Sequence, residues 1–349
     1  MNRFMGKQVL LGLAMTVVAL GFTGCPSSSE PPGDHHAIYT AGHYSDDSKF
    51  NACYWTGTTR TNLPGDGTHD TEANSIFVSG GTVYTAGLYI DNAGIIPCYW
   101  AGTTRTDLPG DGAHPAQARS ITVSGGTVYT AGFYSDGVKE IPCTWTGTTR
   151  TDLAGDGIHH ASALSIYVSG GTVYSAGLYS DGTKTIPCIW TGTTRTDLPG
   201  DGTHSAQARS ICISGGTVYT AGYYSDGSKN IPCTWAGTTR TDLPSEGTNS
   251  AYASSVFVSG GTVYAAGMVY DGSKYRPCYW MGTMRMDLVG DGTHDAEANA
   301  IFVSGGTVYT AGYYDDGVKS VPCYWKGTTR TALPGDGTHN AYAYGIFVD

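Results

Sequence analysis

Charged residues are scarce in this sequence, and basic residues are the scarcer kind. Asp, Glu, Lys and Arg make up 14% of the 349 residues, and 19 Lys and Arg stand against 29 Asp and Glu. A formal net charge of -10 provides no basic stripe to displace counterions from a phosphate backbone, so we expect no nucleic-acid partner. The 25 Tyr and 7 Trp argue against a disordered chain. We therefore expect a folded, acidic protein.

The first 24 residues have the pattern of an export signal. Arg3 and Lys7 precede an apolar run over residues 9–20 that is too short to span a bilayer comfortably, and small residues lead to Cys25. This boundary resembles the lipobox of bacterial lipoproteins, which implies that Cys25 is acylated and becomes the mature N-terminus. Residues 25–36 are rich in Pro and Ser and predict a flexible tether. We expect the protein in the bacterial cell envelope, at the outer membrane or cell surface, attached to membrane through this lipid only.

A 45-residue repeat fills the rest of the chain. Its markers are seven Trp residues, which we expect to be structural, each with a Cys two positions before it. The Trp residues are Trp55, Trp100, Trp145, Trp190, Trp235, Trp280 and Trp325. No insertion or deletion interrupts the copies, so residues 37–349 form one array, after a signal peptide over 1–24 and a lipidated tether over 25–36.

Each repeat contains four short segments of β character, and no window shows apolar residues at helical spacing over a helical length. In the second copy the predicted strands are Ala73–Val78, Thr82–Tyr89, Ile96–Trp100 and Thr104–Leu108. Four strands per repeat of this length predict the blade of a β-propeller. The sequence therefore predicts an all-β, seven-bladed propeller with four antiparallel strands per blade.

The two ends of the array predict a closed ring. The first copy starts at Ala37 and lacks its leading strand, whereas the chain ends with one extra strand at Tyr344–Val348. We expect both termini to complete one blade, with Ile346–Val348 paired against Ile38–Thr40. Such closure leaves no unpaired edge between the first and last blades.

Two repeat families resemble this pattern. Trp100, Gly102 and Leu108, followed by Ala118 and Ile121, are similar to the HAF-type extracellular repeats of bacterial envelope proteins, a resemblance that implies no defined catalysis. WD-repeat blades are a weaker match. That resemblance would give His114, Thr130, Asp136 and Trp145 a shared buried hydrogen-bonded network.

The loop before each first strand carries residues that could suggest a metal site. His recurs in six copies and Asn249 stands in the seventh, but equivalent residues of a propeller lie too far apart to share one zinc ion. We predict that each His fixes its own loop by a hydrogen bond; the six are His69, His114, His159, His204, His294 and His339. Asp107, Asp111 and Gly112 leave a calcium site open as an alternative, although the ligand spacing of an EF-type loop is missing. We expect no cofactor and no metal.

Nine Cys residues in an exported protein raise the question of disulfides. The seven repeat Cys share one structural position, and the distance between neighbouring blades should exceed the limit for a bridge. We interpret Cys53 and its equivalents as small buried apolar residues between blades. Cys212 is the one additional thiol in the array, and a partner for it is left open.

Two positions at the start of the first strand differ strongly between copies. We expect them around the mouth of the central channel, where Tyr, Arg, Asn and Gln suit polar recognition, with drift of solvent-facing loops as the alternative. The predicted ligand-binding residues are Glu72, Asn74, Gln117, Arg119, Gln207, Arg209, Tyr252, Glu297, Asn299, Tyr342 and Tyr344.

Three functions follow from this interpretation. The first is a monomeric, lipid-anchored binding or adhesion module for a protein or glycan ligand at the channel mouth. The second is an envelope scaffold, which would resemble in plan the propeller lipoproteins of the BamB type. The third is a propeller lyase or glycosidase. Near-identical blades present the same groups seven times, and no Ser-His-Asp order, nucleophile elbow or phosphate loop is present, so the sequence predicts that the protein is not an enzyme.

Overall fold

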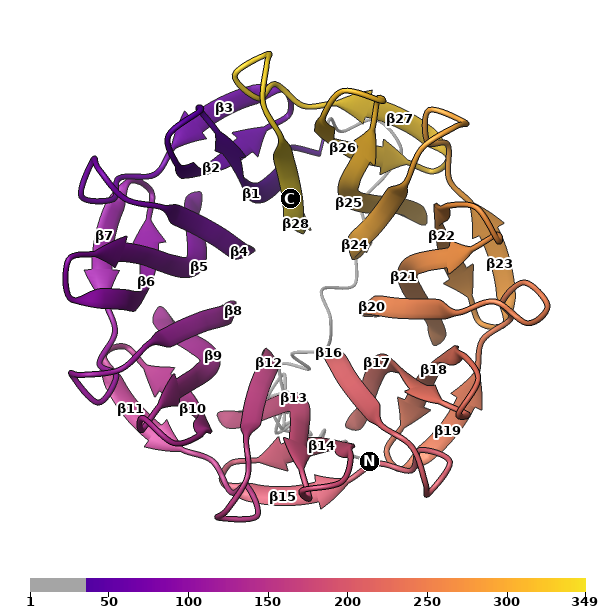
Figure 1. Ribbon diagram of the computed structural model, residues 1–349, viewed down its shortest axis with the longest axis horizontal. Helices are drawn as coiled ribbons and strands as arrows, with labels where there is room; N and C mark the ends of the chain where they lie inside the picture. The colour runs from indigo at the N-terminus through magenta and orange to yellow at the C-terminus, as the bar shows by residue number, and fades with distance from the viewer. Residues whose placement is uncertain (1–35) are drawn as a thin grey trace, which may run out of the picture.

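Each repeat folds into four antiparallel strands in the computed structural model, which describes residues 36–349. Seven such sheets are arranged in a ring around a central axis (Figure 1), so the predicted all-β, seven-bladed propeller is confirmed. The predicted signal peptide, Cys25 and the tether up to residue 35 lie outside the described residues. Within residues 36–349, no helix has the length and apolar character needed to cross a membrane.

In every blade the strands run in order from the channel to the rim. The innermost strands are β4 (Thr71–Ser79), β8 (Ala116–Ser124), β12 (Ala161–Ser169), β16 (Ala206–Ser214), β20 (Ala251–Ser259), β24 (Ala296–Ser304) and β28 (Ala341–Val348). The second strands are β1 (Ile38–Ser45), β5 (Thr82–Asp91), β9 (Thr127–Ser135), β13 (Thr172–Ser180), β17 (Thr217–Ser225), β21 (Thr262–Tyr270) and β25 (Thr307–Asp315).

The third strands are β2 (Phe50–Thr56), β6 (Gly94–Ala101), β10 (Glu140–Thr146), β14 (Thr185–Thr191), β18 (Asn230–Ala236), β22 (Tyr275–Met281) and β26 (Ser320–Lys326). The outer strands are β3 (Thr59–Asn62), β7 (Thr104–Asp107), β11 (Thr149–Asp152), β15 (Thr194–Asp197), β19 (Thr239–Asp242), β23 (Met284–Asp287) and β27 (Thr329–Ala332). In six of the seven blades a two-residue Gly-Gly turn joins the first and second strands, and Gly80 and Gly81 adopt φ values of 55° and 75° that favour glycine, whereas β28 and β1 of the closing blade are not joined by a turn.

The closing blade contains both ends of the array. Strand β28 pairs antiparallel with β1, and Ile38 lies opposite Val348 while Thr40 lies opposite Ile346. The amide of Asp349 also donates to the carbonyl of Ala37 at 3.0 Å. The predicted pairing of the termini is therefore confirmed in register.

The repeated Trp residues fix each blade to its neighbour. Every one has a fully buried side chain, and Trp145 Nε1 donates to the carbonyl oxygen of Pro109, in the loop that precedes its own blade, at 3.0 Å. The hydrogen-bonded network that the WD-repeat resemblance would imply therefore does not form among these described residues. His114 bonds to Asp111 instead, and the buried Thr130 hydroxyl has no hydrogen-bond partner within the described residues.

A second set of contacts joins the innermost strands. The Ser75 hydroxyl accepts a hydrogen bond from the amide of Ile121 in the next blade at 3.2 Å, and the contact recurs at Ser120, Ser165, Ser210 and Ser255. At the two equivalent positions that flank the closing blade, Ala300 and Gly345 have no hydroxyl. Five inter-blade joints thus share a contact that these two joints lack.

Candidate binding site at the channel mouth

A β-bulge in each innermost strand turns one side chain into the channel. In the second blade the pairing shifts between Ala73 and Ser75, which leaves Asn74 as the extra residue. Gly87 on β5 makes this possible, because a Cβ there would lie 1.8 Å from the carbonyl oxygen of Glu72. The second variable position of each repeat is this bulge residue.

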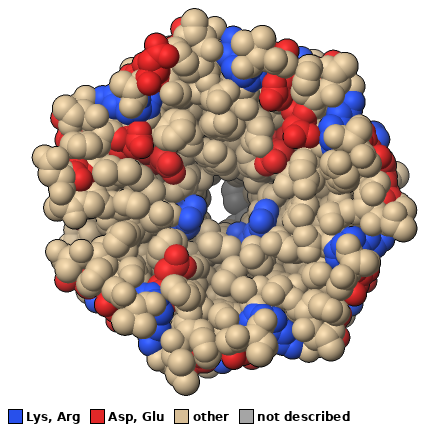
Figure 2. Space-filling view, viewed as in Figure 1, with Lys and Arg blue, Asp and Glu red and all other residues tan. Residues whose placement is uncertain are grey.

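The seven bulge residues line a cavity of about 250 Å³ in the channel. They are Asn74, Arg119, Leu164, Arg209, Ser254, Asn299 and Tyr344. Figure 2 shows basic side chains at the edge of the central opening, with acidic groups farther out on the same face. The sequence-based placement of these residues around the channel is thus what the structure shows.

Two arginines on blades separated by one other blade provide the positive charge of the channel. The Arg209 guanidinium lies 4.9 Å from the ring centroid of Tyr223, and the Arg119 guanidinium lies 5.7 Å from that of Phe133. Neither forms an ion pair with a carboxylate within residues 36–349. Both can therefore bind an anion without first breaking an ion pair within the described residues.

The two asparagines of the same ring have a structural contact. Asn74 Nδ2 donates to the carbonyl of Ala118 at 3.1 Å, and Asn299 Nδ2 donates to that of Ala343 at 3.0 Å. Because their amides already bridge neighbouring blades, they have less capacity for a ligand than the arginines.

The first variable position lies two residues before the bulge residue and pairs with a residue of the second strand. Its residues are Glu72, Gln117, Ser162, Gln207, Tyr252, Glu297 and Tyr342. Their partners on the second strand also vary, a feature that sequence reasoning missed: His43, Leu88, Phe133, Leu178, Tyr223, Met268 and Tyr313. Comparing the seven repeat copies residue by residue would have identified this variable position on the second strand as well.

Variable residues at the start of the third strand extend the mouth. Asn230 Nδ2 donates to the Tyr252 hydroxyl at 2.8 Å, and the Ser162 hydroxyl donates to Glu140 at 2.8 Å. Both pairs join one blade to the next. The surface that differs between blades therefore includes residues of the first, second and third strands of each blade.

Aromatic residues gather at the closing blade. The Tyr342 ring meets the Tyr313 ring edge-on, with centroids 4.9 Å apart, and stacks near Tyr344 at 6.1 Å. His43 lies 5.4 Å from Tyr342 and 5.5 Å from Tyr344. Strands β25, β28 and β1 thus bring four rings together beside the channel.

Two glutamates flank these rings, one on each neighbouring blade. Burial raises the pKa of Glu72, and burial also raises the pKa of Glu297, to which the Tyr313 hydroxyl hydrogen-bonds. Neither carboxylate forms an ion pair within the part of the chain that the structure describes.

The loop histidines fix their own loops, as predicted. His114 Nδ1 lies 2.6 Å from a carboxylate oxygen of Asp111, whose other oxygen accepts the amides of Ala113 and His114. These hydrogen bonds lower the pKa of Asp111. In the calcium alternative Asp107 would be a second ligand, but it accepts bonds from Tyr89 and Arg105. Residues 36–349 contain no group of three His, Cys, Asp or Glu placed to hold a metal ion.

The repeat cysteines are buried thiols, which confirms their predicted packing role. All seven are free and have no exposed surface. Cys143 and Trp145 belong to one cluster with Ala86 and Leu108 of the preceding blade. Burial raises the pKa of these thiols, so they are unreactive at neutral pH.

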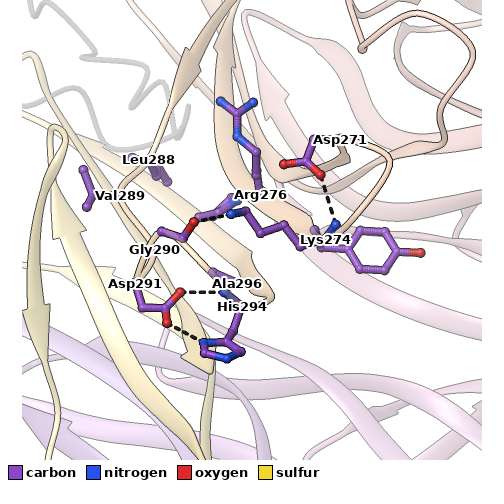
Figure 3. A pocket seen from close by; sticks show the side chains of 12 residues that line it. Asp271, Lys274, Arg276, Leu288, Val289, Gly290, Asp291, His294 and Ala296 are labelled. Carbon is purple, nitrogen blue, oxygen red and sulfur yellow. Dashed lines mark hydrogen bonds and ion pairs between the residues drawn. The ribbon is translucent and has the colours of Figure 1, made fainter. Parts of the chain in front are cut away.

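Pockets at the rim repeat with the blades. One of about 480 Å³ is lined by Arg276, Leu288, His294 and Ala296 (Figure 3), where Asp291 bonds to His294. Smaller pockets of about 270 and 160 Å³ have the equivalent Leu, His and Ala residues in other blades. These rim pockets follow from the repeat, whereas the channel mouth does not.

Comparisons with solved structures give distant matches. The β-propeller domain of the Trilobed protease from Pyrococcus furiosus matches 88% of this chain and 95% of its own length, at 10% identity and a TM-score of 0.54. A mutant Aleuria aurantia lectin in complex with Fucα1-6GlcNAc matches 72% and 92%, at 12% identity and 0.39. An ulvan lyase from a new polysaccharide lyase family matches 79% and 81%, at 9% identity and 0.48. No family model and no curated protein matches the sequence.

The match to the protease propeller shows the fold alone, and it corrects one prediction. The sequence predicted that the protein is not an enzyme because its blades are nearly identical. The fold is shared with the propeller domain of a protease, so repeated blades give no ground for excluding catalysis. The protease propeller has an open velcro topology, whereas β28 and β1 close the ring here.

Proposed function

We propose that the protein is a lipid-anchored module of the bacterial cell envelope that binds a carboxylate-bearing protein or glycan at its channel mouth. The observation that carries this proposal is the pair Arg119 and Arg209. Both line the channel cavity, neither is ion-paired within the described residues, and both lie beside an aromatic ring. A guanidinium can bind a carboxylate through two parallel hydrogen bonds.

Selectivity for an anion follows from the surroundings of this pair. Removal of residues 1–24 would take away Arg3 and Lys7 and leave 17 basic and 29 acidic residues, a formal charge of -12. In a protein with this negative charge, Arg119 and Arg209, which form no ion pair within the described residues, provide a local positive charge. Gln117 and Gln207, two positions before them, add uncharged donors and acceptors at the same mouth.

Calorimetric titration with an oligomer of glucuronate tests the proposal. The double variant Arg119→Ala with Arg209→Ala should weaken binding about tenfold or more, because it removes both charged anchors. The double variant Gln117→Ala with Gln207→Ala changes the same strands without changing charge and should have a smaller effect. Equal losses of affinity in both variants would contradict the proposal. So would a wild-type protein that binds neither the glucuronate oligomer nor an acidic peptide.

Attachment to the envelope depends on Cys25. The lipobox resemblance and the HAF-like repeat support this part of the proposal, and the acidic charge means that an anionic membrane surface would repel the protein. Cys25→Ser should release the protein from membranes or leave the signal uncleaved. Protease treatment of intact cells then separates a surface-exposed binding module, which is cleaved, from a periplasmic scaffold, which is protected.

A further inference from the structure

The two sides of the channel mouth carry opposite chemistry. Around the closing blade the variable pairs are Glu72 and Asn74, then Tyr342 and Tyr344, then Glu297 and Asn299. On three blades across the channel the corresponding pairs are Gln117 and Arg119, then Ser162 and Leu164, then Gln207 and Arg209. Each triplet has matching outer blades around a different central one.

On the closing side no Lys or Arg of residues 36–349 lies over the aromatic rings. Four rings, those of His43, Tyr313, Tyr342 and Tyr344, lie with neighbouring centroids 4.9 to 6.1 Å apart. Glu72 on β4 and Glu297 on β24 belong to the two blades that neighbour β28, and the charges of both glutamates act on Tyr344, as does the opposite charge of Arg119. Neither carboxylate has an ion-pair partner within residues 36–349.

His43 does not neutralise this charge. Its side chain is 5% exposed, and its Nδ1 atom has no hydrogen-bond partner within the described residues. Burial lowers the pKa of His43 to about 4, so the ring is neutral at pH 7. This buried ring nitrogen of the cluster, without a partner within the described residues, can accept a hydrogen bond from a ligand.

We propose that these six residues bind an organic ammonium group. Tyr faces attract cations that are weakly hydrated, and two desolvated carboxylates provide the countercharge. This inference deepens the proposed function and rests on it, because the ligand would then carry carboxylates for the arginine side and an ammonium group for the closing side.

Titration with tetramethylammonium chloride, followed by NMR of the full mature protein, tests the inference. Sodium chloride at the same ionic strength controls for screening. We expect millimolar binding by the wild type. Glu72→Gln with Glu297→Gln should weaken it at least tenfold, and Tyr342→Leu with Tyr344→Leu should do the same while keeping apolar volume. Glu140→Gln, a carboxylate of the mouth outside the cluster, should change it less than twofold.

Failure of this inference can be distinguished from failure of the proposed function. If glucuronate binds and tetramethylammonium does not, the ammonium site is wrong and the arginine site stands. If tetramethylammonium binds equally well to the Glu72→Gln and Glu297→Gln variant, the cluster does not form the site and the inference is overturned. If neither probe binds, both proposals fall.

Discussion

Away from the channel every blade repeats the same Trp contact, whereas at the channel mouth no two neighbouring blades present the same pair of variable side chains. All seven Trp residues donate to a carbonyl in the loop before their own blade, at 2.9 to 3.0 Å: six bond to a residue 36 positions earlier, and Trp55 of the closing blade bonds to Pro334. The bulge residues range from Leu164 to Arg209 on adjacent blades. The rim therefore assembles the ring, and the mouth varies because the bulge residues share no common partner: Asn74 and Asn299 bond to the next blade, whereas Arg209 lies beside Tyr223.

One rim joint departs from this uniformity. Val269 replaces the Tyr that stacks on Arg in the other six blades, and Arg285 instead contacts Glu246, which also binds Arg276. Glu246 stands where other blades have the Asp of the His-Asp pair, and Asn249 replaces the His. The loss of the Tyr ring at Val269 is thus accompanied by new ion pairs of Glu246 with Arg276 and Arg285. The changes at this joint replace one set of contacts between blades with another.

Of the changes considered, loss of ring closure should lower the stability of the protein the most. Deletion of residues 344–349 removes most of β28, exposes the edge of β1 and opens the ring. We expect loss of cooperative thermal unfolding by calorimetry. An unchanged melting temperature would show that the terminal pairing does not close the propeller.

Truncation of one rim Trp should rank second. Trp145→Ala leaves a large cavity and an unpaired Pro109 carbonyl, and it should lower the free energy of unfolding by about 3–5 kcal/mol. Denaturant titration measures this. Leu164→Ala at the mouth, where the side chain is only partly buried, provides the control and should cost far less.

Acid should act on His43. Its pKa of about 4 in the fold lies below the unfolded value of 6.5, so its stabilising contribution is complete above pH 6.5 and is lost as the pH falls toward 4. The loss should approach roughly 3 kcal/mol. Phe133 stands at the equivalent position of another blade, so Phe should fit at position 43. The variant His43→Phe should therefore lose less stability than the wild type between pH 6.5 and pH 4. Parallel pH profiles would contradict the assignment.

The Ser contacts of the inner joints should give the smallest effect. Ser120→Ala removes the acceptor for the Ile166 amide and should cost about 1 kcal/mol. The reverse change, Ala300→Ser, offers a hydroxyl to the closing joint and should be neutral or stabilising. A destabilising Ala300→Ser would show that the closing blade is packed differently from the others.

The sequence predicted what depends on the repeat period and missed what depends on contacts between repeats. The strands, the number of blades and the pairing of Ile38 with Val348 follow from a 45-residue period and an offset at the termini. The bulge at Asn74 does not, because it depends on the approach of Gly87 to a carbonyl on another strand. The WD-type network failed for the same reason, since the partner of Trp145 is in the preceding loop.

A crystal structure of the mature protein soaked with glucuronate tests the central claim most directly, because the channel mouth and the rim compete for the same carboxylate. We predict density for the carboxylate in the channel, against Arg119 or Arg209. Density only in the rim pocket beside Arg276, with the channel empty of ligand, would contradict the division between a structural rim and a binding mouth.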